Sequence, residues 1–253
     1  MSCHLSHLEH IWNQLYESVT FSKPVSEFLN VGVNPVDEIL KLPGIIEIFG
    51  ESGSGKTQLS QYLSARYVSQ FEGNVLYICL EDSLRTERLL SCCENHGNPR
   101  ALGDRIFLEH IFDASSLKEF ILNVLPISLT TLNIKILVID SLAAAFRVHD
   151  SKDTKTDLFL VMQALKNVCL RNKINCLCMN QVSSIISENI GYSSIYSSSK
   201  PALGLGFFNC IDHQFELRRD IENRSRRLIC IKSPSIKAQQ RVFLVDQTIK
   251  LFI

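Results

Sequence analysis

The sequence contains the stretch Gly50-Glu51-Ser52-Gly53-Ser54-Gly55-Lys56-Thr57, which fits the phosphate-binding pattern G-x-x-x-x-G-K-[ST] at every fixed position. An apolar run precedes it and a helical pattern follows it, which is the context that such a loop requires. Glycines let the backbone bend so that its N–H groups point into one concavity, and the start of the next helix adds to the attraction for phosphate. Lys56 would reach the β- and γ-phosphates, and the Thr57 hydroxyl would ligate Mg²⁺. We assign all eight residues to a nucleotide site.

Strands and helical patterns alternate from residue 44 onward. The apolar runs that predict buried strands are 45–49, 75–80, 106–108, 134–139 and 174–179. The segments with helical spacing are 55–70, 84–94, 115–125 and 154–172. A sheet covered on both faces has strands that are continuously apolar, as these are. The predicted fold class is therefore α/β, a P-loop NTPase core with a mostly parallel sheet and helices on both faces.

The C-terminal part of the chain has a different pattern. Short strands without helices between them are predicted at 211–219, 228–232 and 241–245, which suggests an antiparallel extension of the sheet. Before them, residues 183–206 are rich in Ser and Gly and are predicted to form a long loop. A loop of that length inside a compact domain is usually functional or disordered.

The N-terminal part carries one apolar helical stripe, made by Leu5, Leu8, Trp12, Leu15 and Val19. That stripe either covers this protein's own core or docks to a partner chain. We divide the chain into an N-terminal amphipathic helix with its connector, residues 1–30, and an ATPase core, residues 31–253.

Composition argues against several classes of protein. Lys and Arg number 26, as do Asp and Glu, so the 253-residue chain has no net charge, and any DNA contact must come from a local patch. The sequence has no apolar run of about 18 residues, and we expect no membrane span. The nine cysteines include no C-x-x-C pair, which argues against a zinc site and fits a reducing compartment. We expect a location in the nucleus, with the cytoplasm also possible.

Three apolar strands end in polar residues suited to nucleotide chemistry. One ends at Asp140, which would hold the Mg²⁺ shell through water. Another ends at Glu81-Asp82: Glu81 is the expected general base and Asp82 the alternative, although both could be solvated loop acids. The third ends at Asn180-Gln181, and Gln181 could bond the γ-phosphate. The carboxyl ends of parallel strands meet at one edge of the sheet, where ligands bind.

The order of these motifs resembles the RecA-like recombinase core. After the P-loop come Leu76-Tyr77-Ile78-Cys79-Leu80-Glu81-Asp82, then Ile139-Asp140-Ser141-Leu142-Ala143-Ala144-Ala145-Phe146-Arg147, then Asn180-Gln181-Val182. The likeness covers residues 30–253 and is greatest to eukaryotic recombinase paralogues of the X-ray-repair cross-complementing type. It implies ATP and Mg²⁺ as cofactors and a DNA-dependent ATPase of low activity. It also implies a role in homologous recombination and meiosis, within a hetero-oligomer of paralogues on single-stranded or branched DNA.

The resemblance also implies roles for single residues. Lys56, Glu81 and Gln181 match catalytic positions, with Glu81 as the water-activating glutamate and Gln181 as the γ-phosphate sensor. Arg88 matches an arginine that stacks on adenine, although it could be an ordinary charge on a helix surface. Arg147 lies in the first DNA-facing segment, and Lys200 is the one basic residue of the second.

Several departures from the family pattern qualify these expectations. The sequence has no F-x-x-A, and too few residues precede the core for the helical N-terminal domain of many members, so we expect no long homofilaments. A single lysine gives the second loop a weak grip on DNA backbones. The arginines within 218–227 form either a solvated basic turn or a DNA contact. Lys232 stands where central recombinases have an acidic residue; it either acts on a neighbouring subunit's γ-phosphate or is solvated at a strand end.

Two other functions remain open. An assembly factor with these residues could bind ATP as a structural clamp and hardly hydrolyse it. A small-molecule kinase is disfavoured, because the sequence has no obvious Arg-rich lid segment and has Ser-rich loops instead.

Overall fold

The computed structural model describes residues 39–81, 84–146, 152–183, 200–201, 203–220, 225–235 and 242–245. All of them belong to one compact unit, Asn34–Ile253. The helix predicted in the first 30 residues lies outside the described residues, and the division of the chain at residue 30 stays a prediction.

The described strands form one mixed sheet in the order β3-β2-β4-β5-β1-β7-β8-β9, with β6 beside β5. Their bounds are β1 Gly44–Gly50, β2 Asn74–Cys79, β3 Ile106–His110, β4 Ile134–Asp140, β5 Asn175–Ser183, β6 Lys200–Pro201, β7 His213–Asp220, β8 Ser225–Lys232 and β9 Val242–Val245. The predicted α/β sheet, mostly parallel with an antiparallel C-terminal part, is confirmed. The antiparallel part begins one strand later than the pattern suggested, because β7 is parallel to β1 and pairs antiparallel only with β8.

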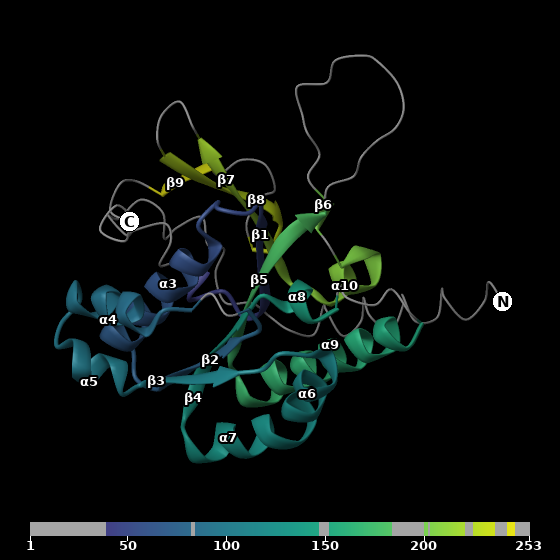
Figure 1. Ribbon diagram of the computed structural model, residues 1–253, viewed down its shortest axis with the longest axis horizontal. Helices are drawn as coiled ribbons and strands as arrows, with labels where there is room; N and C mark the ends of the chain where they lie inside the picture. Colours follow the sequence, from purple (N-terminus) through teal and green to yellow (C-terminus); the bar gives the residue numbers. More distant parts are fainter. Residues whose placement is uncertain are drawn as a thin grey trace. The chain divides into compact units, whose positions relative to one another are not determined.

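Helices cover both faces of this sheet (Figure 1). Their bounds are α3 Lys56–Gln70, α4 Thr86–Glu94, α5 Pro99–Gly103, α6 Ala114–Glu119, the π-helix η2 Phe120–Val124, α7 Leu125–Thr131, α8 Leu142–Phe146, α9 Lys152–Asn172 and α10 Gly204–Cys210. The helix α3 packs on one face, with α4 and α5 beside it, and α6 to α10 lie on the other. Among the described residues, no helix has the length and apolarity needed to cross a bilayer.

The crossover from β5 to β7 explains the late start of antiparallel pairing. It contains α10, whose first residues, Gly204 to Gly206, sequence reasoning assigned to the end of a long loop. Glycine disfavours a helix by roughly 1 kcal/mol relative to alanine. Burial of Phe207 and Cys210 in the core offsets that cost here.

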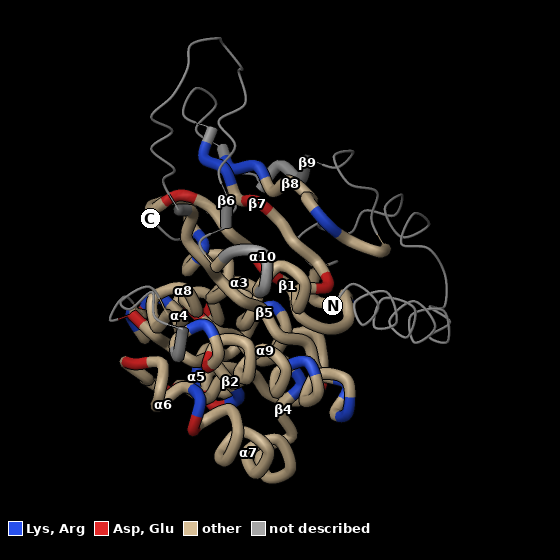
Figure 2. Tube along the Cα trace, turned by 90° about the vertical axis from the view of Figure 1, so that its right-hand side faces the viewer, with Lys and Arg blue, Asp and Glu red and all other residues tan. Residues whose placement is uncertain are grey.

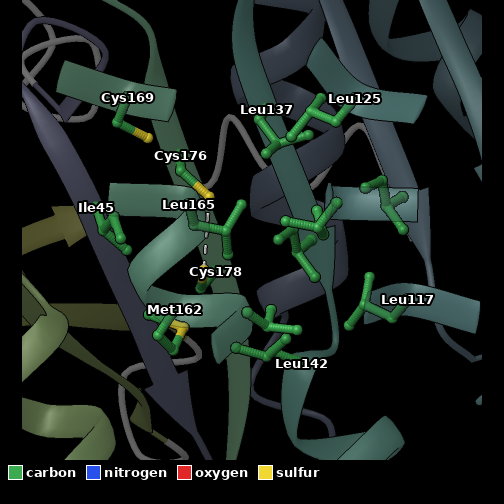
Figure 3. Close-up of a cluster of buried hydrophobic side chains, with 14 of the residues drawn as sticks. Ile45, Leu117, Leu125, Leu137, Leu142, Met162, Leu165, Cys169, Cys176 and Cys178 are labelled. Atoms are coloured by element: carbon green, nitrogen blue, oxygen red, sulfur yellow. Dashed lines mark hydrogen bonds between the residues drawn. The ribbon is translucent and has the colours of Figure 1, made fainter. Parts of the chain in front are cut away.

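A core of buried hydrophobic side chains lies between the sheet and the helices on the α9 side. Alternate strand residues point to opposite faces. On the helix side of the core, Ile45 and Cys176 lie near Leu165 of α9, whereas Leu137 lies toward α7 (Figure 3). All four side chains are fully buried, and burial of such a side chain contributes about 1.5–3 kcal/mol. The apolar side of α9 accordingly packs on β1 and β5.

Candidate nucleotide-binding site

The predicted P-loop joins β1 to α3, and its path depends on two glycines. Gly55 has a φ of +102°, and an added Cβ there would lie 2.7 Å from Arg226 Nε. A side chain in this left-handed conformation is strained whatever space it has. Gly50 lies so close to β7 that an added Cβ would clash with the Leu217 carbonyl oxygen. The loop can follow this path only with glycine at both positions.

Lys56 begins α3, and its ammonium is turned back onto the loop. Nζ donates to the carbonyl oxygens of Gly50 and Glu51, at 2.8 Å each. The side chain is only 8% exposed. A cation held beside the loop backbone in this way attracts phosphate oxygens.

Asp140, at the end of β4, lies against the start of α3. Its Oδ2 accepts a hydrogen bond from the Tyr77 hydroxyl at 2.9 Å, and the Thr57 hydroxyl also bonds to the carboxylate. Burial raises the pKa of Asp140 above its usual 3.8, although the bonds from Thr57 and Tyr77 and the charge of Lys56 lower it. A buried carboxylate next to a hydroxyl is poised to be neutralised by a cation.

Glu81 and Gln181 meet over the same edge of the sheet. Gln181 Nε2 donates to Glu81 Oε1 at 3.0 Å. Glu81 follows β2 and Gln181 lies on β5, the two strands that flank β4. The ends of three adjacent strands therefore bring Glu81, Asp140 and Gln181 together, as the parallel order of the strands requires.

A cavity of about 270 Å³ opens at this edge. Its walls contain most of the predicted nucleotide residues and three that sequence reasoning did not single out; the lining is Ser52, Gly53, Gly55, Lys56, Thr57, Gln58, Glu81, Arg88, Asp140, Ser141, Gln181 and Arg226. Gln58 and Ser141 are direct neighbours of predicted residues, so proximity in sequence could have pointed to them. Arg226 had no such signal.

The residues present fit a nucleotide with Mg²⁺. Thr57 and Asp140 supply hard oxygen donors, which Mg²⁺ prefers. Beside them, Ser141 is 2% exposed, and its Oγ has no hydrogen-bond partner among the residues that the structure describes. A buried hydroxyl at the cavity wall without a partner is a group that a bound ligand or its water shell would satisfy.

The structure does not test either of the residues predicted to contact DNA, Arg147 and Lys200. Arg147 lies outside the described residues, and of Lys200 only the backbone, in β6, is described. The arginines near the β7–β8 turn differ from one another: Arg218, Arg219 and Arg227 are exposed, whereas Arg226 lines the cavity. Arg226 is therefore not part of a solvated turn, and a DNA contact of these arginines stays a prediction.

The structure corrects the reading of Lys232 as a solvated residue. Its Nζ donates to the carbonyl oxygens of Phe208 and Ile211, at 3.0 and 2.7 Å, and lies 4.3 Å from the centre of the Phe208 ring. Burial lowers the pKa of the Lys232 ammonium. A cation favours the negative end of a helix, so Lys232 stabilises the C-terminus of α10 in its own subunit. It is therefore not a solvated residue at a strand end, whereas its action on a neighbouring subunit's nucleotide stays a prediction.

Comparison with known proteins agrees with this geometry. The chain matches the sequence model of the Rad51 family over residues 20–249. It is 28% identical to the DNA repair protein XRCC3 of Mus musculus over 209 residues, which are 72% of this chain and 60% of that protein. It is 26% identical to the XRCC3 homolog of Arabidopsis thaliana over 272 residues, covering 90% of each chain. A meiotic recombination protein DMC1 homolog of Glycine max is 28% identical over 191 residues, 70% of this chain and 54% of the relative.

The chain thus spans about 60% of the length of the mouse relative, and 64% of the XRCC3 protein of Bos taurus. Its sheet, mostly parallel with an antiparallel C-terminal part, is the one that the sequence predicted. The chain belongs to the Rad51 family and is, within it, a RecA-like paralogue similar to XRCC3.

Proposed function

We propose that this chain is an ATP-binding recombinase paralogue that acts in the repair of DNA double-strand breaks by homologous recombination. The observation that carries the proposal is the contact of Glu81 with Gln181 beside Lys56, Thr57 and Asp140. This set combines a phosphate-binding lysine, oxygen ligands for Mg²⁺ and a carboxylate that could activate water. XRCC3 and DMC1 relatives carry DNA repair and meiotic recombination in their names, which supports the nuclear role.

Binding would rearrange the contacts described above. Lys56 would exchange the carbonyl oxygens of Gly50 and Glu51 for the β- and γ-phosphates, and Arg88 would stack on adenine. Thr57 and Asp140 would hold Mg²⁺, which, when bound, neutralises charge on the phosphates. The Ser141 hydroxyl would gain a partner in the same shell.

Hydrolysis requires a water held against the γ-phosphorus by Glu81. The water oxygen forms a bond to phosphorus, the bond from phosphorus to the β,γ-bridging oxygen breaks, and the Glu81 carboxylate takes the water proton. Gln181 already donates to Glu81. When ATP binds, the Gln181 amide would donate to the γ-phosphate instead of to Glu81. That change of partner would couple the state of the nucleotide, through β5, to the segment 184–199.

ATP turnover, measured with and without single-stranded DNA and with co-purified paralogue partners, tests this proposal. Turnover stimulated by DNA and lost in Glu81→Gln, with ATP binding kept, is the expected result. General-base catalysis of this kind is worth roughly 10²–10⁴-fold. Tight ATP binding without turnover in either protein would identify a clamp-type assembly factor instead. A chain that binds neither ATP nor DNA, with or without its partners, would overturn the proposal.

A further inference from the structure

The β7–β8 hairpin lies directly against the P-loop. Gly50 packs against the backbone of Leu217 on β7, and Gly55 packs against the side chain of Arg226 on β8. Arg226 Nε donates to the carbonyl oxygen of Ser54 at 2.8 Å. The close approach of this hairpin is therefore one reason why the loop needs glycine at positions 50 and 55. The bond from Arg226 to Ser54 joins residues that are 172 positions apart in the sequence.

The rest of the Arg226 guanidinium lies at the cavity wall. The bond to Ser54 is made by Nε alone. Within the part of the chain that the structure describes, neither Nη atom donates a hydrogen bond to an acceptor. A guanidinium offers five N–H donors in a planar fork, and that fork matches two oxygens of a phosphate. One edge of the fork is thus anchored to the loop while the other donors are left for a ligand.

The next arginine along β8, Arg227, does not share this environment. Arg226 and Arg227 follow each other on β8, so their side chains point to opposite faces of the sheet. Arg227 is exposed, whereas Arg226 is partly buried against the loop. Figure 2 shows Lys and Arg gathered at the turn end of the β7–β8 hairpin, of which only Arg226 is found among the cavity residues.

We propose that Arg226 binds the polyphosphate of the nucleotide within its own subunit, closing the cavity on the side opposite the strand ends. The inference deepens the proposed function and rests on it. Its Nε–H holds the Ser54 carbonyl, and its Nη donors bind non-bridging phosphate oxygens. The β7–β8 hairpin thereby contacts the bound phosphates through Arg226, whereas Arg227 points to the opposite face of the sheet.

Titrations with ATP and with inorganic tripolyphosphate test this assignment, because the second probe has no base or sugar. Arg226→Ala should weaken both by the same factor, roughly 10- to 100-fold, which is the contribution of a hydrogen bond to a charged group. Arg88→Ala should weaken ATP and leave tripolyphosphate unchanged. The matched control Arg227→Ala should bind both probes as the wild type does.

A second variant separates phosphate binding from a bracing role. Arg226→Gln keeps an amide donor for the Ser54 carbonyl but removes the charge, so it should bind both probes about as weakly as Arg226→Ala. Arg226→Lys, which keeps a charge without the fork, should recover part of the affinity. Wild-type affinity in Arg226→Gln would show that the arginine only braces the loop and would overturn the proposal.

Further outcomes distinguish an error in the inference about Arg226 from an error in the proposed function. If the wild type binds ATP and Lys56→Ala does not, while Arg226→Ala binds both probes normally, the inference about Arg226 is wrong and the nucleotide site stands. If the wild type binds neither probe, the proposed function itself fails. Loss of single-stranded DNA binding in Arg226→Ala with unchanged tripolyphosphate binding would assign the guanidinium to DNA phosphates instead, which also contradicts the proposal.

Discussion

Glu47 and Asp140 are both carboxylates buried in the sheet, and their surroundings differ. Glu47 lies in the middle of β1 and is fully buried; its Oε1 accepts from Asn180 Nδ2 at 2.8 Å and its Oε2 from Gln214 Nε2 at 2.6 Å. Asp140 ends β4 and is 6% exposed. It is bonded only by hydroxyls, those of Tyr77 and Thr57, among the residues that the structure describes.

Burial raises the pKa of both carboxyl groups, so neither burial nor a raised pKa identifies the functional one. The partners do. Amide N–H groups can only donate, and they occupy both oxygens of Glu47. Hydroxyls can donate or accept, and those around Asp140 lie at a cavity wall beside the unpartnered Ser141 Oγ. We infer that Glu47 stabilises the folded sheet, whereas Asp140 binds a ligand in the cavity.

The largest expected effect in this comparison is on stability. Glu47→Ala leaves the side-chain amides of Asn180 and Gln214 buried without an acceptor, and each unsatisfied donor costs about 1–3 kcal/mol. Urea unfolding should therefore show a loss of about 2–6 kcal/mol. ATP affinity measured below the unfolding transition should not change. Stability equal to the wild type would contradict the structural role of Glu47.

Asp140→Ala should give the opposite pattern. Tyr77 keeps a partner, because its hydroxyl lies 2.6 Å from Ser60 Oγ, and Thr57 faces the cavity. The free energy of unfolding without nucleotide should stay within about 1 kcal/mol of the wild type. The Mg²⁺ concentration needed for half-maximal ATP turnover should rise roughly 10- to 100-fold, as for other groups that hold a metal through water. An unchanged Mg²⁺ requirement would remove Asp140 from the metal site.

The smallest effect is on pH dependence. The folded protein binds the Asp140 proton more tightly than the unfolded chain, because burial raises this pKa. Through this group, wild-type stability is higher below the raised pKa and falls as pH rises through it. His213, whose pKa burial lowers to about 4, acts in the opposite direction, with stability lost as pH falls from 6.5.

Comparison of the wild type with Asp140→Ala cancels the contribution of His213. The stability of the wild type relative to the variant should be greater near pH 5 than near pH 7, in buffer without Mg²⁺ or nucleotide. Urea unfolding of both proteins at the two pH values measures this difference. A relative stability that falls on acidification would mean that the pKa of Asp140 is lowered, not raised.

The sequence was sufficient to predict the parallel half of the sheet. Buried strands are continuously apolar, the P-loop pattern marks the first of them, and strand order alone brings Glu81, Asp140 and Gln181 to one edge. The sequence analysis chose Gln181 over Asn180, and the structure gives the physical reason for their different surroundings. Adjacent strand residues point to opposite faces, so Gln181 reaches the cavity while Asn180 turns inward to Glu47 and accepts a bond from the Ala143 N–H.

The role of the antiparallel half in the candidate site was harder to predict, because it depends on packing between segments that are distant in the sequence. Arg226 was one of several arginines near a turn, and only the close approach of β8 to Gly55 distinguishes it. Nor did the sequence show that the Lys232 ammonium bonds to carbonyl oxygens at the end of α10. Residues whose role depends on such contacts carry no local signal.

Calorimetric titration of ATP with Mg²⁺ into the wild type, Lys56→Ala and the control Lys135→Ala tests the central claim most directly. Lys135 is an exposed lysine on β4, away from the cavity. Loss of a buried, hydrogen-bonded charge partner costs about 2–5 kcal/mol, so we expect Lys56→Ala to bind ATP at least about 30-fold more weakly. The control should bind as the wild type does. ATP binding of equal strength by Lys56→Ala and the wild type would contradict the assignment of the nucleotide to this cavity.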